Sequence, residues 1–380
     1  MNEVDELTAP IRLPAIILLS GTPLDRKTSF TRQLVLLAHT LRGYGVEAFA
    51  VGYASEYPGT VSVFGAGGEV ILETASNSGL LQALGAGACV LLGYPDQLQA
   101  LPEAGRSSIP LFLWAQYSRP PRPEDLAGLI PVPLTKRTGD YLHSSGLSGF
   151  PDPIPHGVDT THFYPLADDE RDRIRSSRGL GRRFVVGTVA AHMARKRFDL
   201  VLESFARMLA HKRNAFLIIK TDRLLSHEGF DLISRAKALG VLHSVRIVTG
   251  ELTERGMREL YGQMDVYLNL SEWEGFCIPV IEAMACGVPV ACQLIQGPGE
   301  IVPYKEFLIG GSDIVKDGES VLLQADPGRA AAVLLEAAAL PGLLERLGDE
   351  GITAVKECYD IKRVARTWIK IIEGALRVQK

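Results

Sequence analysis

Short apolar runs alternate with helix-forming segments along the first part of the chain. Because such runs are typical of strands buried on both faces, the alternation predicts a parallel sheet covered by helices. Two prolines interrupt one run, which limits it to an irregular edge or a short strand. The predicted strands are residues 15–20, 46–52, 89–92, 111–114 and the proline-containing run 129–134, and the predicted helices are residues 28–41, 80–84 and 136–144.

The alternation pauses over a polar stretch, residues 156–183, and then begins again. This stretch holds no predicted strand and is typical of a connection between domains. Its six arginines between Arg171 and Arg183 favour a solvated linker helix over an anion-binding site. Beyond it, the predicted strands are residues 184–189, 216–220, 245–249, 266–270 and 288–292, the predicted helices are residues 198–210, 229–239, 254–264 and 279–287, and residues 330–378 are almost all helix formers.

The two alternating stretches predict an α/β protein with two Rossmann-like, doubly wound domains in series. At 380 residues the chain is longer than one hydrophobic core usually supports, which agrees with two domains. Sheets of this kind bind ligands at the carboxyl ends of their strands. We therefore expect a ligand in the cleft between the two domains.

Composition places the chain among soluble globular proteins, with 46% hydrophobic and 22% charged residues. A net charge of −4 supplies no basic field for nucleic acid or an anionic membrane. The acidic start and the short apolar run after it fit neither a signal peptide nor a membrane span. Five cysteines without a Cys-x-x-Cys pair are typical of buried thiols in a reducing compartment. We therefore expect a cytoplasmic protein with no transmembrane segment and no nucleic-acid partner.

Residues 271–291, SEWEGFCIPVIEAMACGVPVA, hold two glutamates around a predicted helix start. Pro279 suits the first helical turn and Gly287 the C-terminal cap. We therefore expect Glu274 on the loop and Glu282 in the first turn. A helix N-terminus is a site for phosphate, and carboxylates beside it accept hydrogen bonds from sugar hydroxyls, which together indicate a ligand such as a nucleotide sugar. The alternative is that Glu282 only complements the helix dipole and that Glu274 is a solvated loop residue.

The run E-G-F-x-x-P-x-x-E-A-M-A-C-G-x-P-V, residues 274–290, resembles the signature of the family-4 glycosyltransferases. That family comprises retaining enzymes of the GT-B fold, with two Rossmann-like domains and a Glu-x7-Glu pair, which here is Glu274 and Glu282. The resemblance covers the chain from residue 153 to the C-terminus, and the first half only in outline. The further stretches that resemble the family, in its order, are IPHGVDTTHFYP, VGTVAAHMARKRFDLVLESFARM, VRIVTGELTERGMRELYGQMDVYLNLS and KDGESVLL.

The resemblance implies an acceptor domain at residues 1–165 and a donor domain at residues 166–360. A terminal helix, residues 361–380, would pack back on the first domain. The implied enzyme is a hexosyltransferase that moves a sugar from a nucleotide diphosphate sugar to an acceptor hydroxyl, with retention at the anomeric carbon. The donor is a substrate, so no cofactor and no metal is expected. The acceptor is left open between a small molecule, a glycan and a peptide.

By the same resemblance, Lys196 and Glu274 are the catalytic residues. Lys196 neutralises the leaving diphosphate, and Glu274 lies close to the donor sugar and its phosphate. The arginine that the family carries about five residues before the lysine is absent, and of the neighbours Arg195 and Arg197 we choose Arg195 as its substitute. The other implied donor contacts are Glu282 to the ribose, the main-chain N–H groups of Phe276, Cys277 and Ile278 to the sugar and diphosphate, and Glu251 and Leu252 to the base.

The first domain departs further from the family. Its Gly-rich loop is reduced to Gly21, and Gln116 stands where the family often has a histidine that faces the transferred sugar. His192 is a further candidate beside the sugar or the diphosphate. These departures leave three alternatives open: a nucleotide-sugar epimerase, a phosphorylase on the same fold, and a non-catalytic partner that binds a nucleotide sugar or only another subunit.

Overall fold

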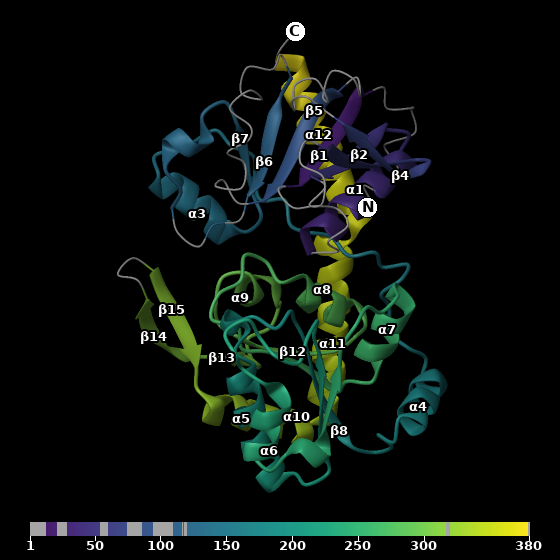
Figure 1. Cartoon of the computed structure of the whole chain (residues 1–380), viewed down its shortest axis with the longest axis vertical. Helices are drawn as coiled ribbons and strands as arrows, with labels where there is room; N and C mark the ends of the chain where they lie inside the picture. The colour runs from purple at the N-terminus through teal and green to yellow at the C-terminus, as the bar shows by residue number, and fades with distance from the viewer. Residues whose placement is uncertain are drawn as a thin grey trace. The chain divides into compact units, whose positions relative to one another are not determined.

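The computed structural model describes residues 13–20, 29–53, 60–73, 86–93, 109–115, 117, 120–316 and 320–378 of the chain. The chain divides into two units, Met1–Gly157 with Ile361–Lys380, and Val158–Asp360. Each unit contains a sheet of mainly parallel strands with helices packed against it (Figure 1). The predicted class, an α/β protein with two Rossmann-like domains, is confirmed.

The first unit is built around five parallel strands. They are β1 (Ala15–Ser20), β2 (Ala48–Tyr53), β5 (Ala86–Gly93), β6 (Leu111–Ala115) and β7 (Ile130–Pro133), with helices α1 (Ser29–Gly43) and α3 (Lys136–Ser144) and a short 3₁₀ turn at Pro123–Leu126. All side chains of β1 are buried, because helices cover both faces of a central parallel strand. β7 carries the two prolines and lies at the sheet edge, where a missing N–H costs least. The predicted helix at residues 80–84 lies outside the described residues.

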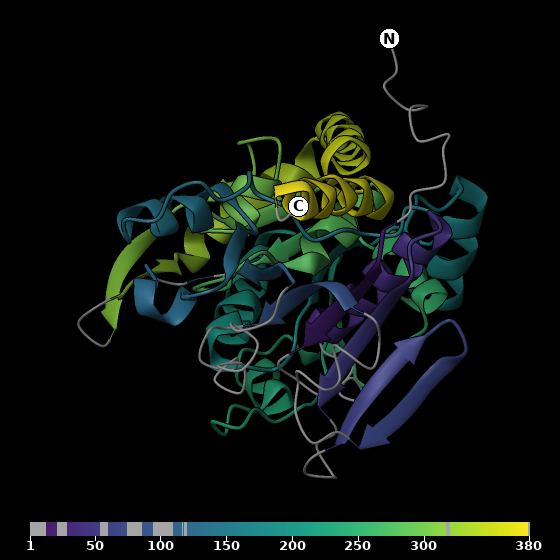
Figure 2. The same ribbon diagram turned by 90° about the horizontal axis from the view of Figure 1, so that it is seen from above.

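A hairpin of two antiparallel strands, β3 (Thr60–Gly65) and β4 (Gly68–Glu73), extends this sheet beside β2 (Figure 2). We predicted no strand there, and the expectation of a wholly parallel sheet is wrong at this edge. The complete strand order is β4-β3-β2-β1-β5-β6-β7. The signal was present in the sequence, because Val61 and Val63 alternate with Thr60 and Ser62, which is the period of a strand.

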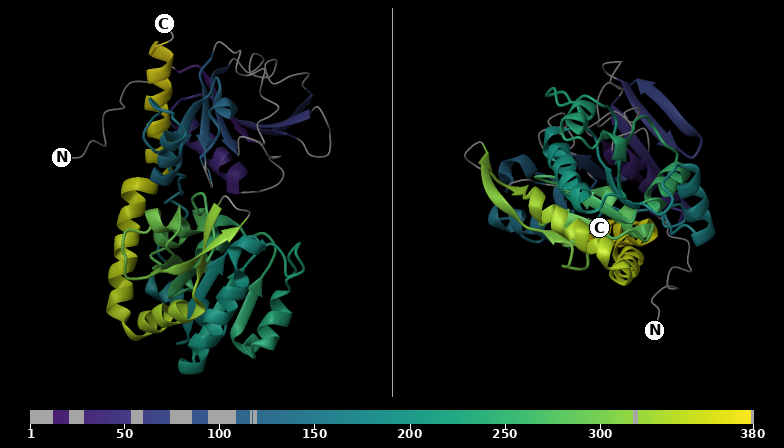
Figure 3. Two further views of the ribbon diagram at one scale, coloured as in Figure 1. Left: turned by 90° about the vertical axis from the view of Figure 1, so that its left-hand side faces the viewer. Right: turned by 90° about the horizontal axis from the view of Figure 1, so that it is seen from below.

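The last helix of the chain, α12 (Ile361–Val378), belongs to the first unit and runs beside α1 (Figure 3). Its apolar residues recur at helical spacing, and Val364, Trp368 and Ile372 are buried. The Trp368 ring meets the ring of Trp114 edge-on at 5.3 Å between centroids, and that of Phe112 at 5.9 Å. Aromatic contacts of this kind fix the helix on the sheet of the first unit.

A buried histidine makes the stability of the first unit dependent on pH. His156 lies against Trp114, and loss of hydration on burial lowers its pKa from 6.5 to about 3. His156 therefore binds a proton less readily in the folded chain than in the unfolded chain. The stabilisation is complete above pH 6.5 and is lost as the pH falls towards 3, by up to about 1.4 kcal/mol per pH unit.

We expect His156→Asn to flatten this part of the pH dependence. The measurement is the hydrogen-exchange protection of β6 (Leu111–Ala115) in both proteins between pH 7 and pH 4. An equal loss of protection in the two proteins would contradict the assignment to His156.

The second unit contains a parallel sheet whose strand order reverses in the middle. Its strands are β8 (Phe184–Val189), β9 (Ala215–Lys220), β10 (Val245–Val248), β11 (Val266–Asn269), β12 (Val290–Gln293) and β13 (Leu308–Ile309), and its first helices are α5 (Phe198–His211), α6 (Leu232–Ala238), α7 (Glu254–Gly262) and α8 (Ile278–Ala285). The order is β10-β9-β8-β11-β12-β13. Because crossovers between parallel strands are right-handed, α5 and α6 cover one face, and α7 and α8 the other.

The reversal lies between β8 and β11, which pair directly. The loops that leave these two strands therefore begin side by side, and the helices that follow them, α5 and α8, lie on opposite faces of the sheet. Sheets of this class bind their ligands at such a point. The corresponding reversal in the first unit lies between β1 and β5, and the segments that follow these two strands lie outside the described residues.

The polar stretch before β8 contains the predicted linker helix, α4 (Asp168–Ser177), which is mostly exposed, but two of its arginines are bound within the second unit. Arg175 is only 5% exposed and, with Arg171, donates to the Asp265 carboxylate at 3.2 and 2.6 Å. Arg258 holds residues 158–165 to the second unit, since it donates to the carbonyls of Tyr164 and Pro165 at 2.9 and 3.1 Å. These arginines fasten the connection to the sheet, which a count of charges does not reveal.

The rest of the second unit is a short hairpin and a helical tail. The hairpin, β14 (Gly311–Lys316) and β15 (Ser320–Ala325), forms a separate antiparallel sheet (Figure 3). The remaining elements are α9 (Pro298–Ile301), α10 (Pro327–Ala339), α11 (Pro341–Ala354), a π-helical turn at Val355–Tyr359 and a 3₁₀ turn at Leu242–Ser244. The prediction that residues 330–378 are almost all helical is confirmed.

Candidate functional site

Two loops meet beside the strand reversal of the second unit. One leaves β8 and passes through a 3₁₀ turn, Ala194–Lys196, before α5 begins at Phe198. The other leaves β11 and reaches α8 at Ile278. The Glu272 N–H donates to the Arg195 carbonyl at 2.9 Å, so the two loops are joined through their backbones.

A buried cluster of charges lies on these loops. Lys196 Nζ forms an ion pair with Glu274 Oε1, and Arg195 Nη1 lies 3.0 Å from Oε2. Ser271 Oγ donates to Oε1 at 2.7 Å. Glu274 is only 4% exposed, so both of its oxygens are used within the protein. The structure thus brings Lys196, Arg195 and Glu274 together, although about 78 positions separate them in sequence.

Arg195 is held in a second way. Its Nη1 also donates to the Trp273 carbonyl at 2.8 Å, and its guanidinium lies over the Trp273 ring at 5.5 Å from the centroid. A stacked, hydrogen-bonded guanidinium keeps a fixed orientation, which a lysine at the same place would not have. Because Glu274 is buried and bound to Lys196 and Arg195, the alternative that it is a solvated loop residue is wrong.

A second ion pair, which we did not predict, lies next to this cluster. Arg197 pairs with the buried Glu272, and its guanidinium also binds Asp199 at 2.8 and 3.0 Å. Arg197 adopts a left-handed conformation with φ of 49°, which is uncommon for a residue with a side chain. The sequence carried a signal, because Arg195 and Arg197 are two positions apart, as are Glu272 and Glu274, and the two pairs have opposite charges. Of the two arginines that we considered, Arg195 reaches Glu274, and Arg197 binds the neighbouring acids.

The charges around Glu274 decide its protonation state. Burial alone would raise the pKa of this carboxyl, but the charges of Lys196 and Arg195, with the hydrogen bonds from Lys196 and Ser271, lower the pKa to about 2. Glu274 is therefore a carboxylate at every physiological pH. It can accept hydrogen bonds and balance positive charge, and it cannot serve as a proton donor near pH 7.

The same pKa shift predicts how acid destabilises the second unit. A carboxyl whose folded pKa is about 2 and whose ordinary value is 4.5 stabilises the fold above pH 4.5 and loses that contribution as the pH falls towards 2. We expect Glu274→Gln to remove this part of the acid dependence, which amounts to at most about 1.4 kcal/mol per pH unit. The measurement is the hydrogen-exchange protection of β8 and β11 between pH 5 and pH 2.5. Parallel curves for both proteins would contradict the assignment.

Backbone geometry prepares the start of α8. Cys277, the residue before the helix, is left-handed with φ of 78°, and its Sγ accepts a hydrogen bond from Asn269 Nδ2 at 3.3 Å. Gly297 packs on the Phe276 backbone so closely that a Cβ there would lie 2.7 Å from the carbonyl oxygen. Only glycine fits at this place, where φ is 80°. The helix then starts at Ile278, and its first N–H groups have no acceptor within the helix.

We predicted that Glu282 lies in the first turn of α8, and this prediction is wrong. The helix starts at Ile278, so Glu282 is its fifth residue and lies in the second turn. Its Oε2 accepts a hydrogen bond from the hydroxyl of Tyr261, on α7, at 2.7 Å. The predicted C-terminal cap is present, because Gly287 has φ of 72° and the Val288 N–H closes on the Ala283 carbonyl.

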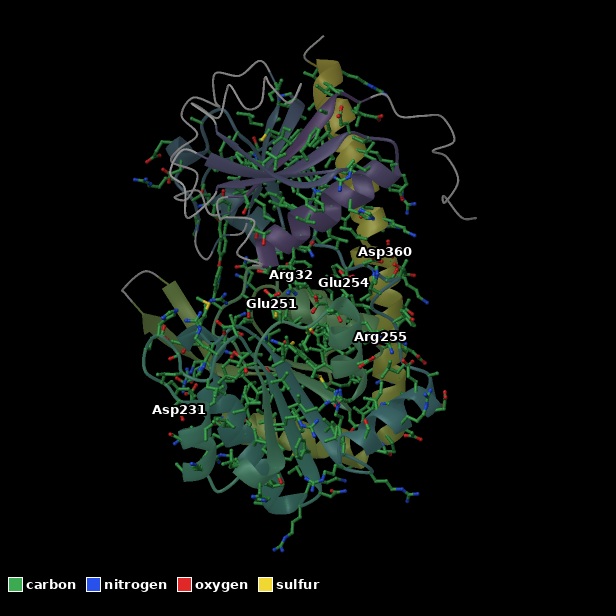
Figure 4. All side chains as sticks on the ribbon, turned by 45° about the vertical axis from the view of Figure 1, so that its right-hand side comes forward. Arg32, Asp231, Glu251, Glu254, Arg255 and Asp360 are labelled. Atoms are coloured by element: carbon green, nitrogen blue, oxygen red, sulfur yellow. The ribbon has the colours of Figure 1, made fainter. Side chains whose placement is uncertain are left out.

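The other predicted site residues are spread more widely. Glu251 and Leu252 lie on the loop between β10 and α7, and Figure 4 shows Glu251 close to Glu254 on the loop and first turn of that helix. His192 is buried, with Nδ1 3.1 Å from the Arg223 carbonyl and its ring edge-on to Phe198. Gly21 and Gln116 lie outside the described residues.

Two negative findings concern the described part of the chain. Among residues 120–316, 320–378 and the shorter described segments, no three His, Cys, Asp or Glu side chains are grouped so that they could hold a metal ion. No helix within those segments is both long enough and apolar enough to cross a membrane.

Comparison with known proteins gives consistent results for the second unit. Residues 170–322 match the family model "Glycosyl transferases group 1". The chain is 34% identical over 146 residues to a GDP-mannose-dependent alpha-mannosyltransferase of Mycolicibacterium smegmatis, a match that covers 38% of this chain and 34% of the relative. It is 27% identical over 225 residues to an MMP alpha-(1->4)-mannosyltransferase of Mycolicibacterium hassiacum, covering 59% of this chain and 48% of the relative.

The match to solved structures is longer and lower in identity. The crystal structure of a glycosyltransferase from Rickettsia africae superposes with a TM-score of 0.75 over 96% of this chain and 99% of that one, at 12% identity. This likeness supports the fold, which is that of the GT-B glycosyltransferases. The chain spans about a third to a half of the length of the two curated relatives.

Proposed function

Residues 170–322 form a glycosyltransferase domain of group 1, and from this premise we propose that the protein transfers a sugar from a nucleotide diphosphate sugar to an acceptor hydroxyl. The observation that carries the proposal is the buried cluster of Lys196, Arg195 and Glu274 beside the N-terminus of α8. It combines fixed cations, a permanent carboxylate and the backbone N–H groups at the start of a helix. A diphosphate joined to a sugar needs these three kinds of partner.

The diphosphate would lie between the cations and the start of α8. Lys196 and Arg195 supply positive charge from one side, and the N–H groups of Phe276, Cys277 and Ile278 supply hydrogen bonds from the other. These groups are placed before the reaction, so they stabilise the charge that develops as the glycosidic bond breaks. We propose Lys196 as the main source of this stabilisation.

Glu274 would hold the cations and meet the donor sugar. Because it is ionised, it does not protonate the leaving group, and a carboxylate with a pKa of about 2 is a poor base. The acceptor proton would therefore pass to the departing phosphate, on the same face from which the acceptor attacks. This mechanism retains the anomeric configuration and requires neither a metal nor a cofactor, as the family resemblance implies.

Glu282 and the loop before α7 would bind the nucleoside. Glu282 lies in the second turn of α8 and would accept hydrogen bonds from the ribose hydroxyls, and Glu251 and Leu252 would contact the base. The two curated relatives are named as mannosyltransferases, and one as dependent on GDP-mannose. We therefore propose a hexose donor and take GDP-mannose as the first one to test.

The test is a thermal-shift series with UDP, GDP, ADP and dTDP and with their sugars, followed by turnover with the donor that stabilises the protein. Two results together would support the proposal: the nucleotides of one base stabilise the wild type, and the wild type releases the nucleoside diphosphate from the corresponding sugar donor. Glu274→Ala should lose this release. Stabilisation without release, against any small-molecule, glycan or peptide acceptor, would favour a non-catalytic binding partner. No stabilisation by any member of the series would overturn the proposal.

A further inference from the structure

We infer that Tyr261 is a positioning residue: its hydroxyl orients the Glu282 carboxylate towards the ribose and so sets the preference for a ribonucleotide. The inference rests on the proposed function, since it concerns the same donor site. The observation is a hydrogen bond of 2.7 Å from Tyr261 Oη to Glu282 Oε2, between two adjacent helices of the second unit.

The packing leaves the tyrosine no freedom. Tyr261 is 0% exposed, and the rings of Phe163 and Tyr267 lie 6.3 and 6.2 Å from it, centroid to centroid. The phenol therefore offers its O–H in one direction only. A hydrogen bond from a buried donor restricts the rotamers that a carboxylate side chain can adopt.

The chemistry of the pair keeps the roles of donor and acceptor fixed. Burial, together with the charge of Glu282, raises the pKa of Tyr261 far above its ordinary value, so the phenol stays protonated and donates. Glu282 is half-buried, so the residue keeps some access to solvent and to a ligand. Vicinal hydroxyls of a ribose are the groups that such an oriented carboxylate accepts best.

Tyr261 also links the two parts of nucleoside recognition. It lies near the end of α7, the helix that begins two residues after Leu252. Thr253 fixes that start, since its hydroxyl accepts the Gly256 N–H at 3.1 Å. The loop proposed to bind the base and the carboxylate proposed to bind the ribose are thus connected through one short helix and one hydrogen bond.

A matched control exists in the same region. Tyr267 is equally buried and neighbours Tyr261, but its hydroxyl donates to the Val189 carbonyl at 3.1 Å. Tyr261→Phe and Tyr267→Phe therefore remove the same atom from the same core. Only the first removes a partner of Glu282.

The experiment measures the affinity of the full chain for GDP, UDP and ADP, and for the 2′,3′-dideoxy form of the one that binds most tightly. The readout is the dissociation constant of the dideoxy form divided by that of the ribonucleotide. A general loosening of the fold weakens the binding of both forms alike and leaves this ratio unchanged. We expect the ratio to fall about fivefold in Tyr261→Phe, a partial loss of hydrogen bonds to a charged group, and to stay unchanged in Tyr267→Phe. Glu282→Asp, which withdraws the carboxylate by one methylene, should lower the ratio in the same way and tests the contact without altering the tyrosine.

The outcomes separate the inference from the proposed function. If the wild type binds none of the three diphosphates, the proposed function fails, and the inference with it. If Glu282→Asp lowers the ratio while Tyr261→Phe does not, the inference is overturned and the proposed function stands. If both tyrosine variants lower the ratio equally, the effect belongs to the packing of the core, and the inference is also overturned.

Discussion

Lys196→Met is expected to lower the kcat of the proposed sugar transfer by about a hundredfold to a thousandfold. Losses of this size follow when one fixed group that stabilises a developing negative charge is removed. Lys196 is only 10% exposed at its side chain and lies directly on Glu274, so bulk water does not replace it. Methionine keeps most of the side-chain volume, which separates the loss of charge from the loss of packing.

The measurement compares kcat with the affinity for the free nucleoside diphosphate. Because the leaving diphosphate carries more charge than the bound donor, we expect kcat to fall more than donor binding weakens. Lys237→Met, on the exposed side of α6 in the same unit, is the control for the loss of one lysine and should leave both quantities unchanged. A kcat within tenfold of the wild type would show that Lys196 is not the main partner of the leaving group.

Asp265→Ala is expected to destabilise the second unit by about 3–5 kcal/mol, the cost of leaving a buried charge without its partner. The carboxylate accepts the Val185 N–H of β8 at 2.7 Å and binds Arg171 and Arg175, so its removal affects three donors. Arg175 has a side-chain exposure of only 6%, and hydration cannot compensate it.

The measurement is the free energy of opening of β8, from hydrogen exchange under native conditions, because the unfolding of a chain with two units is not a two-state process. The control is Asp169→Ala, which removes a carboxylate paired with Arg173 on the exposed side of α4, where both side chains are more than 70% exposed. We expect little change there, since exposed ion pairs contribute little. Equal effects of the two substitutions would mean that the contacts of Asp265 are not what stabilises the sheet.

Ten parallel strands of the two sheets, β1, β2 and β5–β12, could be predicted because each is a short apolar run, and the two-residue strand β13 was missed. The hairpin of β3 and β4 shows where this fails. The residues of β3 alternate between polar and apolar in the sequence, and a short alternation is a weaker signal than a continuous apolar run. In α4 the sequence did not distinguish Arg171 and Arg175, which bind Asp265, from the exposed Arg173.

The residues of the site also fall into those that we predicted from the sequence and those that we missed. The resemblance to the family-4 glycosyltransferases indicated Lys196, Glu274 and Glu282 before any contact was known. Glu282 was misplaced by one turn, because Pro279 marks a helix start only to within a residue or two. We did not predict the ion pair of Arg197 with Glu272, although the charges of the two loops indicated it, and the hydrogen bond from Tyr261 to Glu282 had no signal in the sequence.

The sequence by itself determined which segments become strands and which two loops carry charge. Apolar periodicity decides which segments become strands, and the identity of neighbouring residues decides which loops carry charge. Only the tertiary structure decided which cation meets which carboxylate. The reversal of strand order brings the loops after β8 and β11 together, and burial removes the water that would otherwise separate Lys196 and Arg195 from Glu274. Contacts of that kind depend on the path of the whole chain, because their partners are distant in sequence and their strength comes from the surrounding protein.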